Sequence, residues 1–515
     1  MKPQTWWAAL AFFLAAFLLT IRGHYGSDQF MSYLTAESIV LDHNLAIGVR
    51  PFNLPDIQTN LEGAPVGADG QRYSLYGLAL PLAMTPFYLA GHLAAQALPP
   101  ALHDYVTMFF VSATNAVITA LACLMLIAYA QRLGYRARTS FVLALWYGFG
   151  TMAWNYSQYS FAEPLFAALL LAVLLVLDDL ERGARAGWWR LLLGVLLGLC
   201  VLTEDYAALI CLPAIGVYLL WRLWSRGDGL GRVIGGLAVV VAGALPSLLA
   251  VLWFYELRFG GHGVPRLSGG LSLAFAPVAL YGFAFSSGKS FFLYVPPALL
   301  GVVGLPSLWR RRRALCVLWG VIAAGSVLFI STYVNFWHGD AAWGPRFLFH
   351  LTFLAVLPAG EVLERGLPKA IWKRAAFWLL IAFSGLVQLG GILVNLGKYL
   401  QMVVDQNLGD PHFLPWLSPV VGHWLLVAST LKQALAGRSL VVNYPTGQIE
   451  TPWHPVDLGP YSGFDLWFTN LPHYWHSPAA PWLALIGVVV LLAVAAASLV
   501  YLWPRLAKQT EQRAA

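Results

Sequence analysis

The feature that most constrains this chain is a series of apolar runs, each long enough to cross a lipid bilayer. A membrane-spanning helix needs roughly 17 to 25 predominantly apolar residues. Such runs recur along the 515-residue sequence at residues 5–22, 104–131, 139–156, 161–180, 188–204, 206–225, 231–255, 291–309, 314–333, 346–363, 375–396 and 481–503. The pattern predicts an all-α polytopic membrane protein with about twelve transmembrane helices.

Composition agrees with residence in a membrane and argues against a nucleic-acid partner. Hydrophobic residues make up 59% of the chain and charged residues 11%, whereas a soluble domain has about 25% charged residues. The net charge is +7, but the lysines and arginines fall in short clusters between apolar runs, as expected if they orient the spans. The four cysteines lie inside apolar runs, and we interpret them as packing residues.

The apolar segment 74–98 decides how the chain threads through the membrane. If it spans, the basic clusters after it fall outside, against the rule that cytoplasmic loops are rich in Lys and Arg. The alternative is a re-entrant or surface-lying hairpin, which Pro81, Pro86 and Gly91 would suit. The basic clusters and both termini are then cytoplasmic, and we predict this threading. The clusters are Arg132 to Arg138, Arg182 to Arg190, Arg222 and Arg226, Arg310 to Arg313, Arg365 to Arg374, and the tail from Arg505.

The threading divides the chain into three predicted parts. Residues 1–396 form a transmembrane domain whose first outer loop, with juxtamembrane helices, runs over 23–103. Residues 397–480 form an outer segment long enough for a small folded cap, and 481–515 form the last transmembrane helix and a cytoplasmic tail. Within the outer segment, 420–436 is apolar enough for a further span, but a lysine and a histidine in it favour an amphipathic surface helix.

Just beyond the first apolar run, Asp28 opens a segment in which apolar residues recur at helical spacing. Ser27 is suited to cap a helix that begins at Asp28, and the amphipathic pattern continues to Ile47. The positive end of the helix dipole favours an ionised carboxylate in the first turn, which keeps Asp28 a base at neutral pH. Two interpretations are open on residue type alone: a catalytic base at the membrane surface, or a helix cap.

A second carboxylate, Glu163, lies in the short outer turn 156–164 between two spans. Pro164 at the first helical position places Glu163 at a helix start, where a carboxylate is again favoured, and a cap is again the alternative. Two outer carboxylates with Arg and Lys around them suit a reaction in which a carboxylate deprotonates a hydroxyl group. The cations would stabilise the charge on a departing phosphate.

Five short motifs follow one another along the chain. They are Gly26-Ser27-Asp28, the segment 69–77 (DGQRYSLYG), the segment 161–164 (FAEP), the segment 286–294 (SSGKSFFLY) and the segment 343–347 (WGPRF). In this order, over roughly residues 5–365, they resemble the GT-C superfamily of lipid-carrier-dependent glycosyltransferases. Within it, the chain looks like the bacterial relatives of aminoarabinose transferases and protein O-mannosyltransferases. No single motif is specific, and their order carries the resemblance.

The resemblance implies an inverting transfer of a sugar from a polyprenyl-phosphate donor to a glycan, lipid or protein acceptor. The active site would face the outer side of a bacterial inner membrane, among membrane lipids. By position, Asp28 would be the general base and Glu163 the second acidic residue, and Arg72, Lys289 and Arg346 are candidates to bind the donor phosphate. Candidates for binding the sugar or acceptor are Tyr76, Trp337, His338 and Trp343.

The chain departs from its relatives' pattern in two places. Many relatives have Asp-Glu where this chain has Asp28-Gln29, which removes one candidate ligand. Relatives often have a basic residue at the end of the fifth span, where this chain has Glu204 and Asp205. The second change puts one phosphate contact in doubt, or marks a preference for a cation or an amino sugar. Asp28 and Glu163 could hold a divalent cation or share a proton, so the cofactor is left open and no metal ligand is assigned.

Two other classes of protein are alternatives to the glycosyltransferase. A lipid or sugar transporter or flippase would have ionisable residues in the middle of its spans and an inverted repeat. Here the charged residues collect at the ends of the apolar runs, and no repeat is visible. The other alternative is a non-catalytic scaffold with a GT-C-like fold, which is compatible with the departure from the relatives' pattern at Asp28-Gln29.

Overall fold

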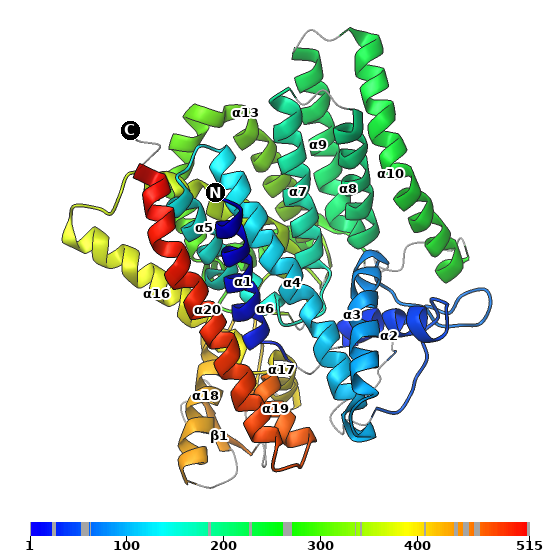
Figure 1. Ribbon diagram of the computed structural model, residues 1–515, viewed down its shortest axis with the longest axis vertical. Coiled ribbons are helices and arrows are strands. Elements are labelled where there is room, and N and C mark those ends of the chain that lie inside the picture. The colour runs from blue at the N-terminus through cyan, green and yellow to red at the C-terminus, as the bar shows by residue number, and fades with distance from the viewer. Residues whose placement is uncertain are drawn as a thin grey trace.

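The computed structural model is almost entirely helical (Figure 1). It describes residues 2–22, 27–52, 61, 63–183, 187–225, 229–260, 270–334, 336–339, 342–405, 408–436, 441–445, 453–457 and 464–511. The α-helices are α1 (Pro3–Leu19), α2 (Ser27–Leu41), α3 (Ala79–Ala95), α4 (His103–Arg132), α5 (Ala137–Gly150), α6 (Met152–Tyr156), α7 (Glu163–Glu181), α8 (Gly187–Thr203), α9 (Asp205–Ser225), α10 (Leu230–Phe259), α11 (Ala276–Phe285), α12 (Phe291–Tyr294), α13 (Pro297–Ser331), α14 (Thr352–Val356), α15 (Gly360–Glu364), α16 (Ile371–Leu393), α17 (Leu396–Asp405), α18 (Pro419–Ala436), α19 (Trp467–Tyr474) and α20 (Ala480–Glu511).

Short 3₁₀ helices and one small sheet complete the described elements. The 3₁₀ helices are η1 (Pro100–Leu102), η3 (Leu273–Phe275), η4 (Arg346–Leu351), η5 (Leu357–Ala359) and η6 (Pro415–Leu417). The strands β1 (Val441–Pro445) and β2 (Trp453–Asp457) pair antiparallel, with Asn443 opposite Pro455. The predicted all-α fold class does not include this sheet.

Seven helical stretches among the described residues are long and apolar enough to cross a membrane. They are η1 with α4, most of α9, α10, α13, the run from η4 to α15, α16, and α20 up to Lys508. Three shorter apolar stretches, namely α1, α8 and η3 with α11, have between 10 and 17 residues. The predicted all-α polytopic fold is therefore confirmed, but helix length and composition do not fix the number of spans at twelve.

α13 consists of two helical arms that meet at a break. The backbone of Arg312 is non-helical, with φ −140° and ψ 48°. Val302 of the first arm and Ala323 of the second line one groove. The arms correspond to the predicted spans 291–309 and 314–333, and the arginine cluster lies at the bend.

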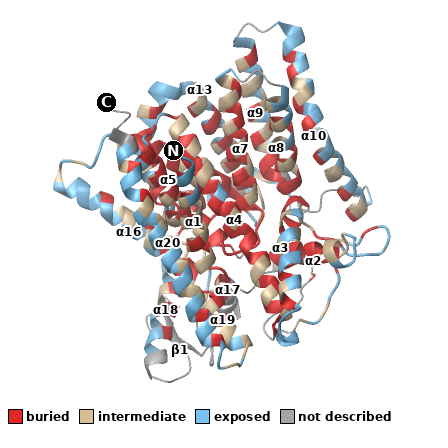
Figure 2. Cartoon of the chain, viewed as in Figure 1, coloured by how far each residue is buried: buried red, intermediate tan, exposed pale blue. Residues whose placement is uncertain are grey.

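The interior of the bundle is formed by α4, α5 and α7, whose residues are mostly buried (Figure 2). Small residues allow close helix contacts: a Cβ on Gly194 of α8 would lie 2.0 Å from the backbone oxygen of Val240 in α10. The four cysteines are buried and free, in agreement with their interpretation as packing residues. On α10, α16 and α20 large apolar side chains are exposed, among them Trp253, Trp378 and Leu485. Extended apolar surface of this kind suits helices that face lipid.

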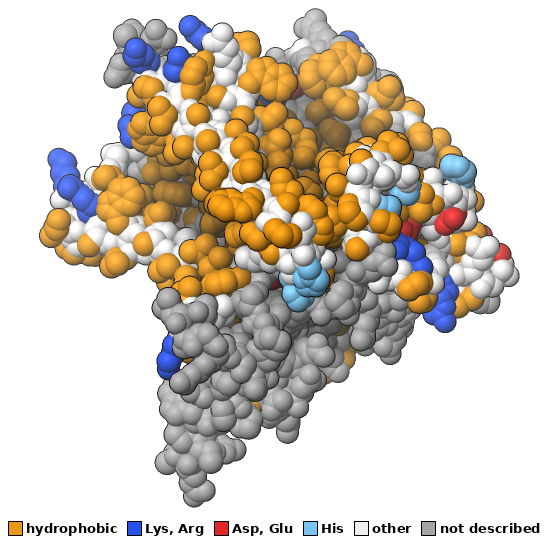
Figure 3. All heavy atoms as spheres, turned by 60° about the horizontal axis from the view of Figure 1, so that its bottom comes forward, with side chains coloured by type: hydrophobic (Ala, Val, Ile, Leu, Met, Phe, Trp, Pro, Cys, Tyr) orange, Lys and Arg blue, Asp and Glu red, His pale blue; other side chains and the backbone are white. Residues whose placement is uncertain are grey.

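The two ends of the bundle carry different elements (Figure 1). One end, here called the α3 end, carries α2, α3, α17, α18, α19 and the sheet. With this end turned forward, the side chains drawn in colour form a broad hydrophobic surface with charged side chains near its margins (Figure 3). The opposite end, here called the basic end, carries the arginines of the bend in α13 and both termini. Near the termini, the Tyr501 hydroxyl donates a hydrogen bond to Gln4 Oε1 at 3.2 Å. It remains a prediction which side of the membrane each end faces. The boundaries of the three predicted parts also remain predictions.

A buried ion pair joins the first helix to the late segment. Arg22 follows α1, and its Nη1 atom lies 3.4 Å from Asp465 Oδ2; the two side chains are 0% and 1% exposed. Arg22 also donates to Gln158 Oε1 at 3.1 Å and to the backbone oxygen of Val394 at 2.6 Å. These partners lie between α6 and α7 and directly after α16, so one guanidinium group holds four distant segments together.

A second cluster of charges fixes the first loop against the bundle. Arg50 Nη2 lies 2.7 Å from Glu37 Oε1 and 2.9 Å from Asp104 Oδ1, and the Tyr88 hydroxyl donates to Glu37 Oε1 at 2.7 Å. Glu37 belongs to α2, Tyr88 to α3 and Asp104 to α4. The amphipathic helix α2 is therefore held on α3 and α4 by hydrogen bonds as well as by its apolar side.

Candidate active site

At the α3 end, two residues that the sequence marks as site candidates form a buried pair. Glu163 opens α7, with Pro164 in the first turn as predicted, and Arg346 opens η4. The Arg346 Nε atom lies 3.8 Å from Glu163 Oε1, and the side chains are 7% and 8% exposed. A small pocket of about 20 Å³ adjoins the pair and is lined by Ser32, Tyr76, Gly77, Leu80, Ser160, Phe161, Ala162, Glu163, Glu204, Arg346 and Phe347.

The turn before Arg346 is fixed by a glycine and by Lys289. Gly344 has a φ of +70°, and a Cβ there would lie 2.6 Å from Met152 Sδ. Lys289 is buried, and its Nζ donates to the backbone oxygens of Ala342 at 2.9 Å and of Gly344 at 3.4 Å. In this geometry Lys289 anchors the turn that presents Arg346, and its contact with a donor phosphate remains a prediction.

The turn before Glu163 is fixed from α4. The Asn115 side chain, near the middle of α4, donates through Nδ2 to the backbone oxygens of Tyr159 and Phe161, the latter at 2.8 Å. Both carbonyl groups belong to the short connection that leads into α7. The position of Glu163 therefore depends on a polar residue inside a membrane-length helix, where such residues are rare and usually have a specific partner.

Tyr76 lines the pocket, and a buried arginine holds the segment that carries it. Arg258, at the end of α10, donates through Nη1 to the backbone oxygens of Ser74 at 3.1 Å, Leu75 at 3.0 Å and Tyr76 at 3.3 Å. The side chain of Arg72 is exposed and does not line the pocket. The structure therefore brings Tyr76 to the Glu163–Arg346 pair and leaves Arg72 at the surface of the first loop.

The Asp69-Gly70 motif forms a turn at the edge of the first loop. Gly70 has a φ of +78°, and the Tyr73 hydroxyl donates to Asp69 Oδ2 at 2.6 Å. This hydrogen bond, together with one from the Gln71 N–H, lowers the pKa of Asp69. Burial and the bond to Asp69 raise the pKa of Tyr73 to about 12. The turn shapes the connection that leads to Tyr76.

The other aromatic candidates lie away from the pocket. Trp343 is 1% exposed, and its indole N–H donates to a glutamine oxygen of α16 at 3.2 Å. Trp337 is 4% exposed and packs edge to face on Phe283, with ring centroids 5.3 Å apart. The His338 ring lies 4.2 Å from the His412 ring. Among the described residues that line the pocket, none of these three predicted sugar-binding residues appears.

The placement of α2 relates Asp28 to the pocket. α2 begins at Ser27, within one residue of the predicted start, and Asp28 lies in its first turn. The Asp28 side chain lies outside the part of the chain that the structure describes. Ser32, four residues further along α2, lines the pocket, and positions i and i+4 share one side of a helix. The helix backbone therefore places position 28 on the side of α2 that meets the pocket.

Glu204 lines the pocket, although the sequence interpretation does not count it among the site residues and names it only as a departure that could mark a preference for a cation or an amino sugar. It lies between α8 and α9, is 4% exposed, and brings a second carboxylate to the pocket. The signal in the sequence is a pair of acids at the junction of two spans, noted there only as a departure from the relatives. Over the described residues, no group of three or more His, Cys, Asp or Glu side chains is arranged to hold a metal ion.

An apolar groove is lined by residues that closely follow the two cations of the site in the chain. Phe291, two residues after Lys289, and Leu348, two residues after Arg346, both line this groove. The groove has a volume of about 490 Å³, runs between the arms of α13, and is lined throughout by apolar residues and glycine. Its volume lies within the range of small-molecule sites, about 300–1,000 Å³. The sequence interpretation does not include the groove, because its walls come from separate elements between residues 280 and 358 that only folding brings together.

The sequence matches no family model and no curated protein. The structure is similar to that of ArnT from Cupriavidus metallidurans bound to undecaprenyl phosphate, at 14% identity and a TM-score of 0.48 over 98% of this chain and 76% of the other. It is similar to the apo state of the same protein at 14% identity and a TM-score of 0.46, over 95% and 74% of the two chains.

A third similar structure is the oligosaccharyltransferase from Archaeoglobus fulgidus in complex with Zn and sulfate. The identity is 14% and the TM-score 0.42, over 76% of this chain and 56% of the other. The three structures belong to the GT-C class that the sequence motifs resemble. At these scores the likeness is one of overall helical arrangement, and we assign no residue and no activity from it.

Proposed function

We propose that the chain is a membrane glycosyltransferase that transfers a sugar from a polyprenyl-phosphate donor to an acceptor hydroxyl or amine. The observation that carries the proposal is that the Glu163–Arg346 pair lines a small pocket, and that Phe347 of this pocket is followed in the chain by Leu348 of the apolar groove. A polyprenyl-phosphate sugar has the same division into a long apolar chain and an anionic head. Under the predicted threading, the reaction takes place on the outer side of a bacterial inner membrane.

In the proposed reaction, Asp28 is the general base. Its carboxylate takes the proton of the acceptor group, whose oxygen or nitrogen attacks the anomeric carbon of the sugar. The bond between that carbon and the phosphate oxygen breaks, and polyprenyl phosphate leaves with the electron pair. A single displacement of this kind inverts the anomeric centre, as the resemblance implies.

Arg346 is the proposed partner of the departing phosphate. Its guanidinium group is buried, held at the start of η4 by the Gly344 turn, and paired with Glu163. A buried guanidinium offers charge-assisted hydrogen bonds to phosphate oxygens with little reorganisation. Glu163 holds Arg346 in place and, with Asp28, is where a divalent cation would bind if the reaction needs one.

A transfer assay with the purified full chain tests the proposal. The carrier is undecaprenyl phosphate, the lipid bound in one of the ArnT structures, loaded with radiolabelled sugars and assayed with glycan, lipid and peptide acceptors. We expect the wild type to transfer label and Arg346→Gln to lose about 10²–10³-fold in turnover. Assays with and without EDTA decide whether a divalent cation takes part. No transfer with any donor and acceptor would contradict the proposal and favour a scaffold or a transporter.

The groove leads to a prediction on donor chain length. Ala323 lines the groove, and Ala323→Phe fills part of it, so we expect KM for a long-chain donor to rise by about tenfold. A donor with a truncated, water-soluble chain should keep its KM. Ala324→Phe is the matched control, because Ala324 is exposed and does not line the groove. Equal KM values for the long-chain donor in the two variants would mean that the donor's polyprenyl chain binds outside this groove.

A second prediction concerns the positioning of Glu163. Asn115→Leu removes the donor from two buried carbonyl groups in the turn before α7, at a cost of about 1–3 kcal/mol each. We expect turnover to fall by about tenfold or more, with a lower unfolding temperature. Thr119→Val, one helical turn further along α4, is the control: its buried hydroxyl has no hydrogen-bond partner among the described residues, so activity should be retained. Full activity of Asn115→Leu would show that this turn does not position the site.

A further inference from the structure

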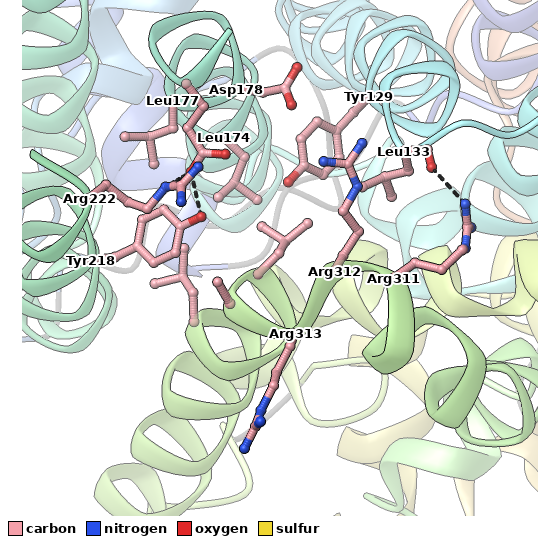
Figure 4. Close-up of a pocket in the computed structure, with 14 residues that line it drawn as sticks. Tyr129, Leu133, Leu174, Leu177, Asp178, Tyr218, Arg222, Arg311, Arg312 and Arg313 are labelled. Atoms are coloured by element: carbon pink, nitrogen blue, oxygen red, sulfur yellow. Dashed lines mark hydrogen bonds and ion pairs between the residues drawn. The ribbon is translucent and has the colours of Figure 1, made fainter. Parts of the chain in front are cut away.

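A second pocket lies at the basic end, at the far end of α7 from Glu163 (Figure 4). α7 has 19 residues and is therefore about 28 Å long, close to the thickness of a bilayer's hydrocarbon core, and the two pockets lie toward its opposite ends. The pocket has a volume of about 200 Å³ and combines arginines, acids and tyrosines with leucine side chains. This combination of charged and apolar side chains suits an amphiphile with a small polar headgroup.

The acids at the basic end are neutralised by arginines. Glu181 of the pocket lies 3.0 Å from Arg222 Nε and accepts a hydrogen bond from the Tyr218 hydroxyl. Asp178, the other acid of the pocket, lies 2.6 Å from Arg182 Nε and 3.8 Å from Arg132 Nη1. Nearby, Asp179 pairs with Arg132, Glu361 with Arg311, and Glu364 with Arg136. Five acids and five arginines thus form ion pairs there.

Three arginines at the bend of α13 add positive charge beyond these pairs. Over the residues that the structure describes, Arg310, Arg312 and Arg313 take part in no ion pair. Arg312 interrupts the helix, and its side chain extends over the pocket beside Tyr129 (Figure 4). Arg313 also lines the pocket, but its guanidinium group is directed away from Arg312 and Tyr129 and lies over the Trp309 ring, 5.6 Å from its centroid. The excess charge beside Tyr129 in the pocket is therefore that of Arg312.

We propose that this pocket binds the phosphate of an anionic membrane lipid in the leaflet opposite to the candidate active site. The planar guanidinium group of Arg312 matches two phosphate oxygens, and basic pockets between membrane helices are suited to lipid headgroups. Leu315 and Leu318 of the second α13 arm and Leu174 and Leu177 of α7 line the same pocket, where they contact the first part of the acyl chains. The bound lipid bridges α7, α9 and the bend of α13 at the end of the bundle away from the candidate active site.

Native mass spectrometry of the full chain in detergent tests this site. The probes are phosphatidylglycerol and phosphatidylcholine with the same acyl chains, and inorganic phosphate. We expect one phosphatidylglycerol to bind about tenfold more tightly than phosphatidylcholine, and Arg312→Gln to remove this preference, as the loss of one charge-assisted hydrogen-bonding group predicts. Millimolar inorganic phosphate should not displace the lipid.

Arg313→Gln is the matched control, because it removes the same charge from the same bend, and the Arg313 guanidinium group is directed away from Arg312 and Tyr129. We expect it to bind phosphatidylglycerol as the wild type does, and Arg312→Lys to bind with intermediate affinity. Equal weakening by Arg312→Gln and Arg313→Gln would overturn the pocket in favour of general surface charge. Binding of inorganic phosphate in place of the lipid would overturn the lipid as the occupant. The unfolding temperatures of the variants, measured without lipid, check that each is folded.

Discussion

Asp28→Asn is expected to lower the turnover of sugar transfer by about 10²–10⁴-fold, the contribution of a general base. Asparagine has nearly the same shape as aspartate but does not take up the proton of the acceptor. The donor is bound through Arg346 and the apolar groove in the proposed function, so its KM should change little. Initial rates over a range of donor concentrations, in the assay that detects wild-type transfer, separate the two constants.

Asp42→Asn is the matched control for this substitution. Asp42 follows α2 directly and is exposed, so the same chemical change occurs near the same helix without reaching the pocket. Activity within about twofold of wild type is expected, because surface substitutions of this kind usually change little. If Asp28→Asn turns over as fast as Asp42→Asn, Asp28 is a helix cap and another group accepts the proton.

The parts of the fold that follow from local pattern agree between sequence and structure. The helical spacing after Ser27 predicts α2, and Pro164 correctly places the start of α7 at Glu163. The basic stretch between two apolar runs predicts the bend in α13. Each of these features depends on residues within one or two helical turns, so the chain specifies it without knowledge of the distant contacts.

The site itself depends on contacts that local pattern does not contain. Glu163 and Arg346 are each marked by a motif, but their pairing joins segments that are far apart in the chain. For Trp343 and Trp337, local pattern predicts a site role that the structure does not show. An aromatic residue beside polar neighbours suits both sugar stacking and core packing, and in the structure both indole rings are buried. Lys289 likewise suits a phosphate, yet its amino group contacts backbone oxygens.

The buried pair of Arg22 and Asp465 shows what a single long-range contact contributes. The two residues are 443 positions apart, and Asp465 also accepts hydrogen bonds from Asn395 at 2.8 Å and Asn470 at 2.9 Å. Charge pairing in a buried site offsets the cost of removing both ions from water only while both partners remain. The pair therefore makes the docking of the late segment depend on the end of the first helix.

Arg22→Met is accordingly expected to destabilise the protein by about 3–5 kcal/mol, because it leaves the buried Asp465 without its cation. Asp465→Asn should cost less, since the amide oxygen still accepts hydrogen bonds and Arg22 keeps its backbone partners. The double variant should lose less than the sum of the two single losses, as expected for residues in contact. Arg182→Met is the control, because its pair with Asp178 is half exposed and worth about 0–1 kcal/mol. Tryptophan fluorescence during thermal and chemical unfolding in detergent measures all four, and strictly additive losses would mean that Arg22 and Asp465 act independently.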